Sequence, residues 1–219
     1  MKTVIACVCS AAVLALASTA PAQEFSFNAT ATSDYVWRGV SQSDEDFALQ
    51  GGADFAYGSF YAGTWASSVE FGDDTDAEWD IYLGFAPSAG GYDWDFGVTH
   101  YMYVGDPDGS EYDFTEVSVG LARAIGEVTV GGKVAYSPDF FGSEDDATYL
   151  EGNFEFEAAP RLTLSGAVGQ QWVDSGADYI SWNLGGAYAL TDAFGIDLRY
   201  HDTAKNDWGA IFEGRVVVS

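Results

Sequence analysis

The chain has 219 residues, of which 47% are hydrophobic and 16% aromatic, and its formal net charge at pH 7 is −26. So strong a negative charge repels nucleic-acid phosphates and anionic lipid headgroups, which disfavours both as direct partners unless cations bridge the contact. The aromatic content argues against intrinsic disorder, and the length suits one domain.

Residues 1–22 have the features of a cleaved signal peptide. Lys2 supplies a minimal positive start, and an apolar, alanine-rich core follows it. This core is shorter than the roughly 20 apolar residues that a membrane-spanning helix needs. Ala20-Pro21-Ala22 then forms a small-x-small cleavage motif before Gln23. We expect export, cleavage after Ala22, and a single mature domain over residues 23–219.

A lipoprotein leader is the alternative at this end, because Val4-Ile5-Ala6-Cys7 resembles a lipidation motif. Most of the apolar core follows that motif instead of preceding it, which favours the ordinary signal peptide. Both cysteines, Cys7 and Cys9, precede the cleavage site. The mature domain would therefore contain neither a disulfide nor a cysteine-ligated metal.

Large apolar residues alternate with polar or small ones along the rest of the chain, as Trp79, Ile81 and Leu83 do with Asp80, Tyr82 and Gly84. Successive residues of a strand face opposite sides of a sheet, so each such segment has one apolar and one polar face. The pattern predicts twelve strands, near residues 25–37, 46–57, 59–68, 76–86, 91–103, 111–123, 127–137, 147–157, 160–172, 177–189, 193–202 and 207–218.

The connections between these segments alternate in length. Tight ones fall at 58, 87–91, 124–126, 158–160 and 190–192, and longer ones at 38–45, 70–75, 105–110, 138–146, 174–176 and 203–206. Strands of about ten residues with short turns at one end and longer loops at the other are typical of outer-membrane barrels. We predict an all-β, antiparallel, up-and-down transmembrane barrel. A soluble β-sandwich alternates too, but twelve strands of one-sided aromatics would overfill its core.

Tryptophans lie near the ends of the predicted strands. Trp94 lies beside a tight turn, and the others lie beside longer loops: Trp37, Trp65, Trp79, Trp172, Trp182 and Trp208. Because an indole ring prefers the membrane–water interface, we expect these residues to form the aromatic girdles of the barrel.

The segment Ser33-Asp34-Tyr35-Val36-Trp37-Arg38-Gly39-Val40-Ser41-Gln42-Ser43 closely resembles the N-terminal signature of the TorF porin family. Looser resemblances follow in order at 61–69, 78–82, 136–142, 181–184 and 200–202. The resemblance implies an exported channel in the outer membrane of a Gram-negative bacterium, and it brings no catalytic residues. Its signature residues here are Ser33, Asp34, Tyr35, Trp37, Arg38, Gly39, Ser41 and Gln42. One departure is that the chain ends Val216-Val217-Val218-Ser219, without the terminal aromatic that the barrel-assembly machinery reads.

If the apolar face meets lipid, the opposite face lines a lumen in which acids outnumber bases. The expected lumen-lining residues are Asp34, Arg38, Asp54, Asp80, Asp93, Asp95, Glu116, Lys133, Glu151, Glu155, Asp197, Arg199, Glu213 and Arg215. Acidic linings favour cations, so the hypothesis is a narrow, weakly cation-selective pore for small neutral or cationic solutes. In the alternative reading, the four basic residues pair with the acids and plug the barrel, because twelve strands fall between filled and open barrels.

The longer loops carry acidic runs at 73–76, 106–109 and 144–146. These could bind divalent cations through oxygen ligands, but none has the spacing of a defined calcium loop, and a solvated surface is the simpler interpretation.

Enzymatic chemistry finds little support in the sequence. The two histidines, His100 and His201, have no serine motif beside them, and Asp93 and Asp95 merely share one strand face. We expect no cofactor and no enzymatic activity. Expected partners are outer-membrane lipid and lipopolysaccharide, the assembly machinery and permeating solutes. The runner-up function is a non-conducting barrel that serves structure or adhesion through its acidic loops, and a soluble secreted β-protein is the third class.

Overall fold

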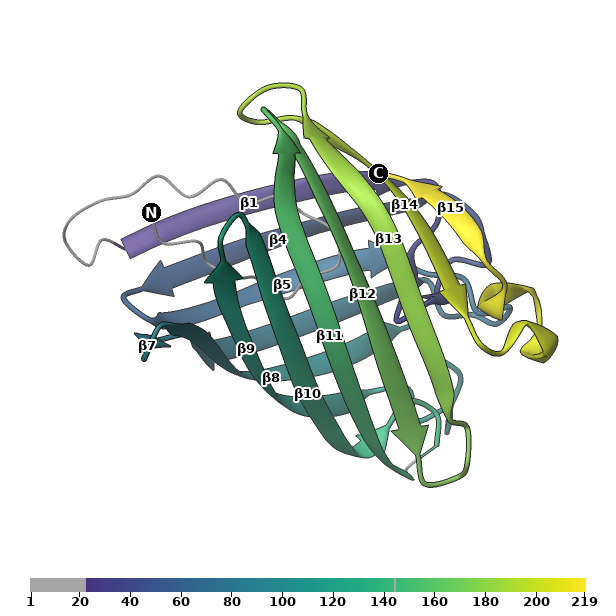
Figure 1. Ribbon diagram of the computed structural model, residues 1–219. Coiled ribbons are helices and arrows are strands. Elements are labelled where there is room, and N and C mark those ends of the chain that lie inside the picture. The colour runs from purple at the N-terminus through teal and green to yellow at the C-terminus, as the bar shows by residue number, and fades with distance from the viewer. Residues whose placement is uncertain (1–22, 144) are drawn as a thin grey trace.

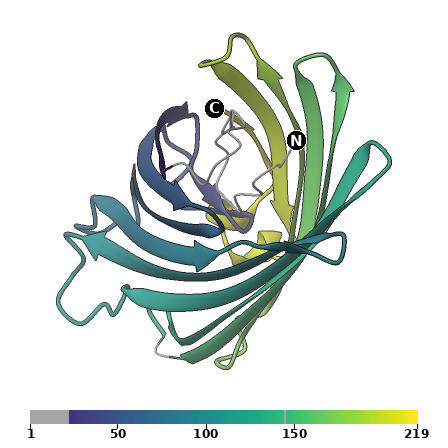
Figure 2. The ribbon, with the colours of Figure 1, turned by 90° about the vertical axis from the view of Figure 1, so that its left-hand side faces the viewer.

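The computed structural model describes residues 23–143 and 145–219, and the predicted signal peptide lies outside these residues. Twelve strands pair antiparallel in chain order: β1, β4, β5, β6, β8, β9, β10, β11, β12, β13, β14 and β15. The short β7 adds to β8, and β2 pairs with β3 apart from the main sheet. The strands curve into a nearly closed barrel (Figure 1, Figure 2). The all-β, antiparallel, twelve-stranded prediction is therefore confirmed.

The observed elements are β1 Gln23–Thr32, β2 Val36–Trp37, β3 Val40–Ser41, β4 Ala48–Tyr57, β5 Phe60–Ser68, β6 Ala77–Phe85, β7 Ser88–Ala89, β8 Tyr92–Val104, β9 Phe114–Ile125, β10 Val128–Phe140, β11 Asp145–Ala159, β12 Leu162–Val173, β13 Tyr179–Ala189, β14 Gly195–Thr203, the 3-10 turns η1 Asn206–Trp208 and η2 Ala210–Phe212, and β15 Arg215–Val218. No helix among the described residues is long and apolar enough to cross a bilayer.

Two predicted strands are shorter than expected. β1 stops at Thr32 because the chain turns at Ser33 into a separate two-stranded ladder, so the strand predicted over 25–37 was wrong in its last third. The strand predicted over 207–218 is confirmed only at its end. Two 3-10 turns precede it, flanking Gly209, whose φ of 131° only glycine adopts readily.

The first and last strands of the barrel meet at one point. The Ser33 amide donates to the Val218 carbonyl at 2.9 Å, and the Val218 amide donates to Ser33 Oγ at 3.0 Å. β15 pairs with β14 only from Leu198 to His201. The seam between β1 and β15 is thus closed near the loop end of β1.

The large apolar side chains lie on the outside of the barrel, with Phe27 exposed at 81% and Leu83 at 58%. Among the described strands, charged residues on this face fall only near strand ends, at Arg123, Asp146 and Asp202. The buried residues lie on the opposite face and are in large part polar. The barrel therefore has an apolar outside and a polar inside, which is the reverse of a water-soluble sandwich.

Candidate functional site

The segment between β1 and β4 folds into the barrel. We call residues 33–47 the inward hairpin. Its strands β2 and β3 pair Val36 with Ser41 and Trp37 with Val40. The two turn residues, Arg38 and Gly39, have φ values of 48° and 84°, which is the pattern of the tight turn that joins two hairpin strands. All eight signature residues lie in this hairpin.

Asp34 holds the base of the inward hairpin. Its carboxylate accepts hydrogen bonds from Ser41 Oγ at 2.6 Å and Ser43 Oγ at 3.0 Å. Arg215 Nη1 from β15 pairs with the same carboxylate at 3.0 Å, and Asp34 is almost fully buried. The first residues of the hairpin are thus tied both to its return strand and to the end of the chain.

The tip of the inward hairpin reaches the far wall. A side chain on Gly39 would lie 2.8 Å from Ser181 Cβ on β13 and from Thr203 Cγ2 on β14, so glycine alone permits this approach. On the other side, the Tyr35 hydroxyl donates to Glu78 Oε1 on β6 at 3.0 Å. The hairpin therefore spans the lumen from β6 to β13 and β14.

Arg38 makes the principal contact between the inward hairpin and the wall. Its Nη2 donates to Glu116 Oε2 on β9 and its Nη1 to Gln171 Oε1 on β12, both at 2.8 Å. The guanidinium carbon lies 4.1 Å from the ring centroid of Trp37 and 4.0 Å from that of Tyr149 on β11. Glu116 is 4% exposed and Gln171 1% exposed. The guanidinium is thus enclosed by acceptors in its plane and by two aromatic rings.

Asp80 on β6 has a buried carboxyl oxygen, Oδ1, that is not hydrogen-bonded among the described residues. The residue as a whole is 8% exposed. Trp65 on β5 and Tyr101 on β8 are its cross-strand neighbours. Because a buried carboxyl oxygen without a donor is costly, the structure holds Asp80 at this position at some expense in stability.

An aromatic cluster closes the loop end of the barrel over β8, β9 and β10. Trp37 packs on Tyr101, Phe114 and Phe140 with centroid distances of 5.9, 6.2 and 6.2 Å. The cluster continues through Phe71, Tyr103, Tyr112 and Phe141. Trp65 is buried at 8% inside the barrel. The expectation that Trp37 and Trp65 belong to a girdle was therefore wrong, because packing against interior aromatics holds them inside. Trp79, Trp172 and Trp182 are exposed on the outside.

The acidic loops are joined to this cluster. The Tyr112 hydroxyl donates to Asp73 Oδ2 at 2.9 Å, which raises the pKa of Tyr112. Hydrogen bonds from Thr75 lower the pKa of Asp73. Among the described residues no three acids or histidines come close enough to hold a metal ion. Glu144 lies outside the described residues.

Interior side chains are more exposed in the half of the lumen near the tight turns than around the inward hairpin. Asp54 accepts from the Tyr82 hydroxyl, and Asp95 accepts from the Tyr61 hydroxyl at 2.8 Å. Glu155 is exposed although it shares the inner face of β11 with Glu151. Interior carboxylates in this half are partly or fully exposed.

Basic residues in this half are few. Arg199 pairs with Asp197 at 3.0 Å and donates to Asn183 and Ser165 at 2.8 Å each. Lys133 has no ion pair within the part of the chain that the structure describes.

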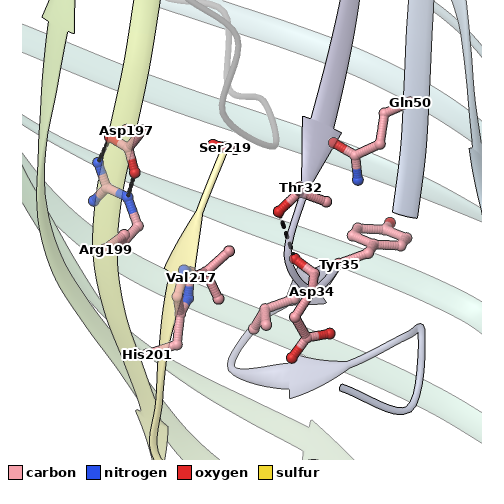
Figure 3. Close-up of a pocket in the computed structure, with 10 residues that line it drawn as sticks. Thr32, Asp34, Tyr35, Gln50, Asp197, Arg199, His201, Val217 and Ser219 are labelled. Carbon is pink, nitrogen blue, oxygen red and sulfur yellow. Dashed lines mark hydrogen bonds and ion pairs between the residues drawn. The ribbon is translucent and has the colours of Figure 1, made fainter. Parts of the chain in front are cut away.

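A small cavity of about 40 Å³ lies at the seam, where the inward hairpin faces β14 and β15 (Figure 3). Asp34 and Tyr35 line it from the hairpin side, and Arg199 and His201 from β14. His100, in contrast, is on the outside of the barrel, where its Nδ1 lies 2.9 Å from Thr115 Oγ1.

The structure places the predicted lumen residues in three groups. Asp34, Arg38, Asp80, Glu116 and Arg215 gather around the inward hairpin. The other strand residues share inner-face parity along the tight-turn half: Asp54, Asp93, Asp95, Lys133, Glu151, Glu155, Asp197 and Arg199. Glu213 is the exception, because it is exposed between η2 and β15 and lies on no strand.

Sequence reasoning missed Glu78 and Gln171, which are nearly fully buried on the inner face. Glu78 shares the strand parity of Asp80, so the alternation itself could have identified it. Gln171 carries no charge, and its part in holding Arg38 depends on contacts across the lumen that no local pattern reveals.

The barrel resembles solved porin structures. The KdgM porin superposes with a TM-score of 0.61 at 7% identity, with 90% of this chain and 96% of that chain covered. A porin refined at 1.8 Å covers 78% of this chain and 59% of its own, with a TM-score of 0.44 at 15% identity. OpdK, an outer-membrane protein of Pseudomonas aeruginosa, covers 79% and 56%, with a TM-score of 0.43 at 14% identity. At such low identity these likenesses concern the fold alone.

Comparison at the level of sequence is more direct. No curated protein matches the chain. A family model described as "Bacterial protein of unknown function (Gcw_chp)" matches residues 16–214, which include the inward hairpin and all but the last strand. The chain therefore belongs to the Gcw_chp family of bacterial proteins.

Proposed function

We propose that this chain is an outer-membrane channel for small cationic and neutral solutes, narrowed by the inward hairpin. The observation that carries the proposal is the division of the barrel into an apolar outside, uncharged except near strand ends, and an acid-rich inside. Exposed apolar rows of this size are unfavourable in water and favourable in lipid. The likeness of the fold to the KdgM porin supports the same function.

The proposal includes export with cleavage after Ala22, a place in the outer membrane among lipid and lipopolysaccharide, and assembly by the barrel-assembly machinery. It also includes the narrower kinship with TorF porins that residues 33–43 suggest. Cation preference follows from the excess of acids on the inner face. Among the described residues Asp54, Glu151 and Glu155 form no ion pair, while Arg38, Arg199 and Arg215 are each paired with an acid.

The filled loop half favours a second candidate, a non-conducting barrel with a structural or adhesive role. The inward hairpin spans the lumen, and Arg38, Arg199 and Arg215 each pair with an acid. In this case the acidic loops would be the functional surface.

Planar-bilayer recordings on the refolded protein in a potassium chloride gradient separate the two candidates. A cation-selective pore makes the dilute side positive at zero current. The Glu155→Gln variant, which removes an exposed carboxylate from the inner face, should reduce this potential, whereas Asp146→Asn, on the outside of the barrel, should leave it unchanged. A folded barrel without conductance would favour the second candidate, and a dilute side that becomes negative would contradict cation preference.

A further inference from the structure

Arg38 occupies a site that belongs to the wall of the barrel. The residues that surround its guanidinium come from separate strands: Glu116 from β9, Tyr149 from β11 and Gln171 from β12. The Tyr101 hydroxyl on β8 donates to the same Glu116 Oε2 at 3.2 Å. These side chains are nearly fully buried. Arg38 itself comes from the inward hairpin, which is not part of the barrel sheet.

The wall site has the chemistry that a planar organic cation requires. Glu116 supplies a charged acceptor, Gln171 supplies a neutral acceptor in another direction, and the ring of Tyr149 covers one face of the guanidinium at 4.0 Å. An acceptor pair with an aromatic wall binds guanidinium and ammonium groups in preference to a bare metal ion. Among the described residues no acidic cluster suited to a metal ion is present either.

The hairpin presents Arg38 at some conformational cost. Its φ of 48° is unusual for a residue with a side chain, and a ladder of two residue pairs supports the turn. A non-glycine residue held in such a conformation is strained, and the contacts of the guanidinium must offset that strain. The contacts at the wall therefore hold the hairpin tip in place.

We infer that Glu116, Gln171 and Tyr149 form a binding site for solutes that carry a guanidinium or ammonium group, and that Arg38 is its tethered occupant. The inference rests on the proposed function, because a permeating cation would meet this site when Arg38 leaves it. The hairpin and the wall site then act as one gate, in which a solute of this class replaces the arginine.

The test uses Arg38→Ala, refolded and checked by heat-modifiable gel migration, with millimolar guanidinium as the probe and urea as its neutral counterpart. Conductance of the variant should exceed that of the wild type, and guanidinium but not urea should reduce it. If Arg38 vacates the site in about one tenth of wild-type molecules, the wild type should need about tenfold more guanidinium than Arg38→Ala for the same fractional occupancy of the site. Arg123→Ala is the matched control, because that arginine lies 5.1 Å over Tyr92 on the outside of the barrel.

A binding measurement keeps the inference separate from the channel. Guanidinium should change the tryptophan emission of Arg38→Ala, and the double variant Arg38→Ala/Glu116→Gln should lose this response. A response without conductance would support the site and contradict the channel. Equal effects of guanidinium and urea would overturn the inference. If Arg38→Ala does not fold, Arg38→Lys replaces it. Lysine keeps the positive charge but lacks the planar, two-pronged donor group of arginine, so guanidinium should displace it from the site more readily than it displaces Arg38 in the wild type. Failure of guanidinium to displace the lysine would overturn the inference.

Discussion

The two halves of the lumen are built from the same alternation but differ in packing. In the loop half, Glu78, Glu116 and Gln171 are nearly fully buried beneath the inward hairpin. In the tight-turn half, Asp54 and Asp95 bond to single tyrosines, and interior carboxylates are partly or fully exposed. Inner-face parity therefore decides which side chains point inward, while the hairpin decides which of them lose contact with water.

This difference implies that one kind of substitution has two outcomes. A carboxylate in the loop half is held by several partners in a dry setting, where removal leaves charges unpaired. A carboxylate in the tight-turn half has water as an alternative partner. Matched substitutions in the two halves measure how far this difference in burial changes the free energy of unfolding.

The largest effect is expected from Asp34→Ala. The change removes the acceptor of Ser41 and Ser43 and the closer ion pair of Arg215, which keeps a longer contact to Glu45, at 3.7 Å, and its backbone carbonyl acceptors at Ala210 and Glu213. Breaking a buried pair in this way costs about 3–5 kcal/mol. The free energy of unfolding, measured by urea titration in detergent micelles, should fall by that amount.

Asp197→Ala is the matched change in the tight-turn half. Arg199 keeps Asn183 and Ser165 as acceptors, and the pair is more exposed, so the expected loss is about 1 kcal/mol. Equal losses for the two variants would show that the halves do not differ in the way that burial suggests.

Trp37→Ala should have the next largest effect. Its ring packs on Tyr101, Phe114 and Phe140 and lies under Arg38, so its removal takes away both an aromatic anchor and one face of the guanidinium. Truncating a packed aromatic costs about 3 kcal/mol. Trp79→Ala, on the outside of the barrel, is the control for loss of an indole in general, and it should cost less in urea titrations.

The division into two halves could not be predicted from the sequence, although the barrel could. Alternation defines each wall strand, and the spacing of turns defines their order. The failure lies at residues 33–37, where Tyr35 and Trp37 continue the alternation of β1 although the chain has left the sheet. Arg215, which holds this turn through Asp34, is 181 residues further along the chain than Asp34. At 207–214, glycine conformation and 3-10 turns interrupt a similar pattern.

Candidate site residues follow the same division. The alternation placed Asp80 and Glu116 on the inner face, but it gave no sign that one has an unsatisfied carboxyl oxygen among the described residues and that the other holds Arg38. The preference of indole rings for the membrane interface predicted the wrong place for Trp37 and Trp65. Both rings pack instead on interior aromatic residues that are distant in the sequence. Gln171 was missed because the lumen residues were predicted from charged side chains only.

A smaller effect than that of Trp37→Ala is expected from a change of glycine to alanine, and it tests how closely the loop half is packed. Gly169 on β12 lies directly against the ring of Tyr149, so an added methyl group would push that ring away from its place over Arg38. Overpacking of this kind costs about 1–2 kcal/mol. Gly152, on the outside of β11, has no atom within 4 Å of an added methyl group. Gly169→Ala should therefore lower the free energy of unfolding and raise conductance by loosening Arg38, whereas Gly152→Ala should change neither. If both variants behave alike in urea titration and in bilayer recordings, the Tyr149 ring does not hold Arg38 in the way that its geometry indicates.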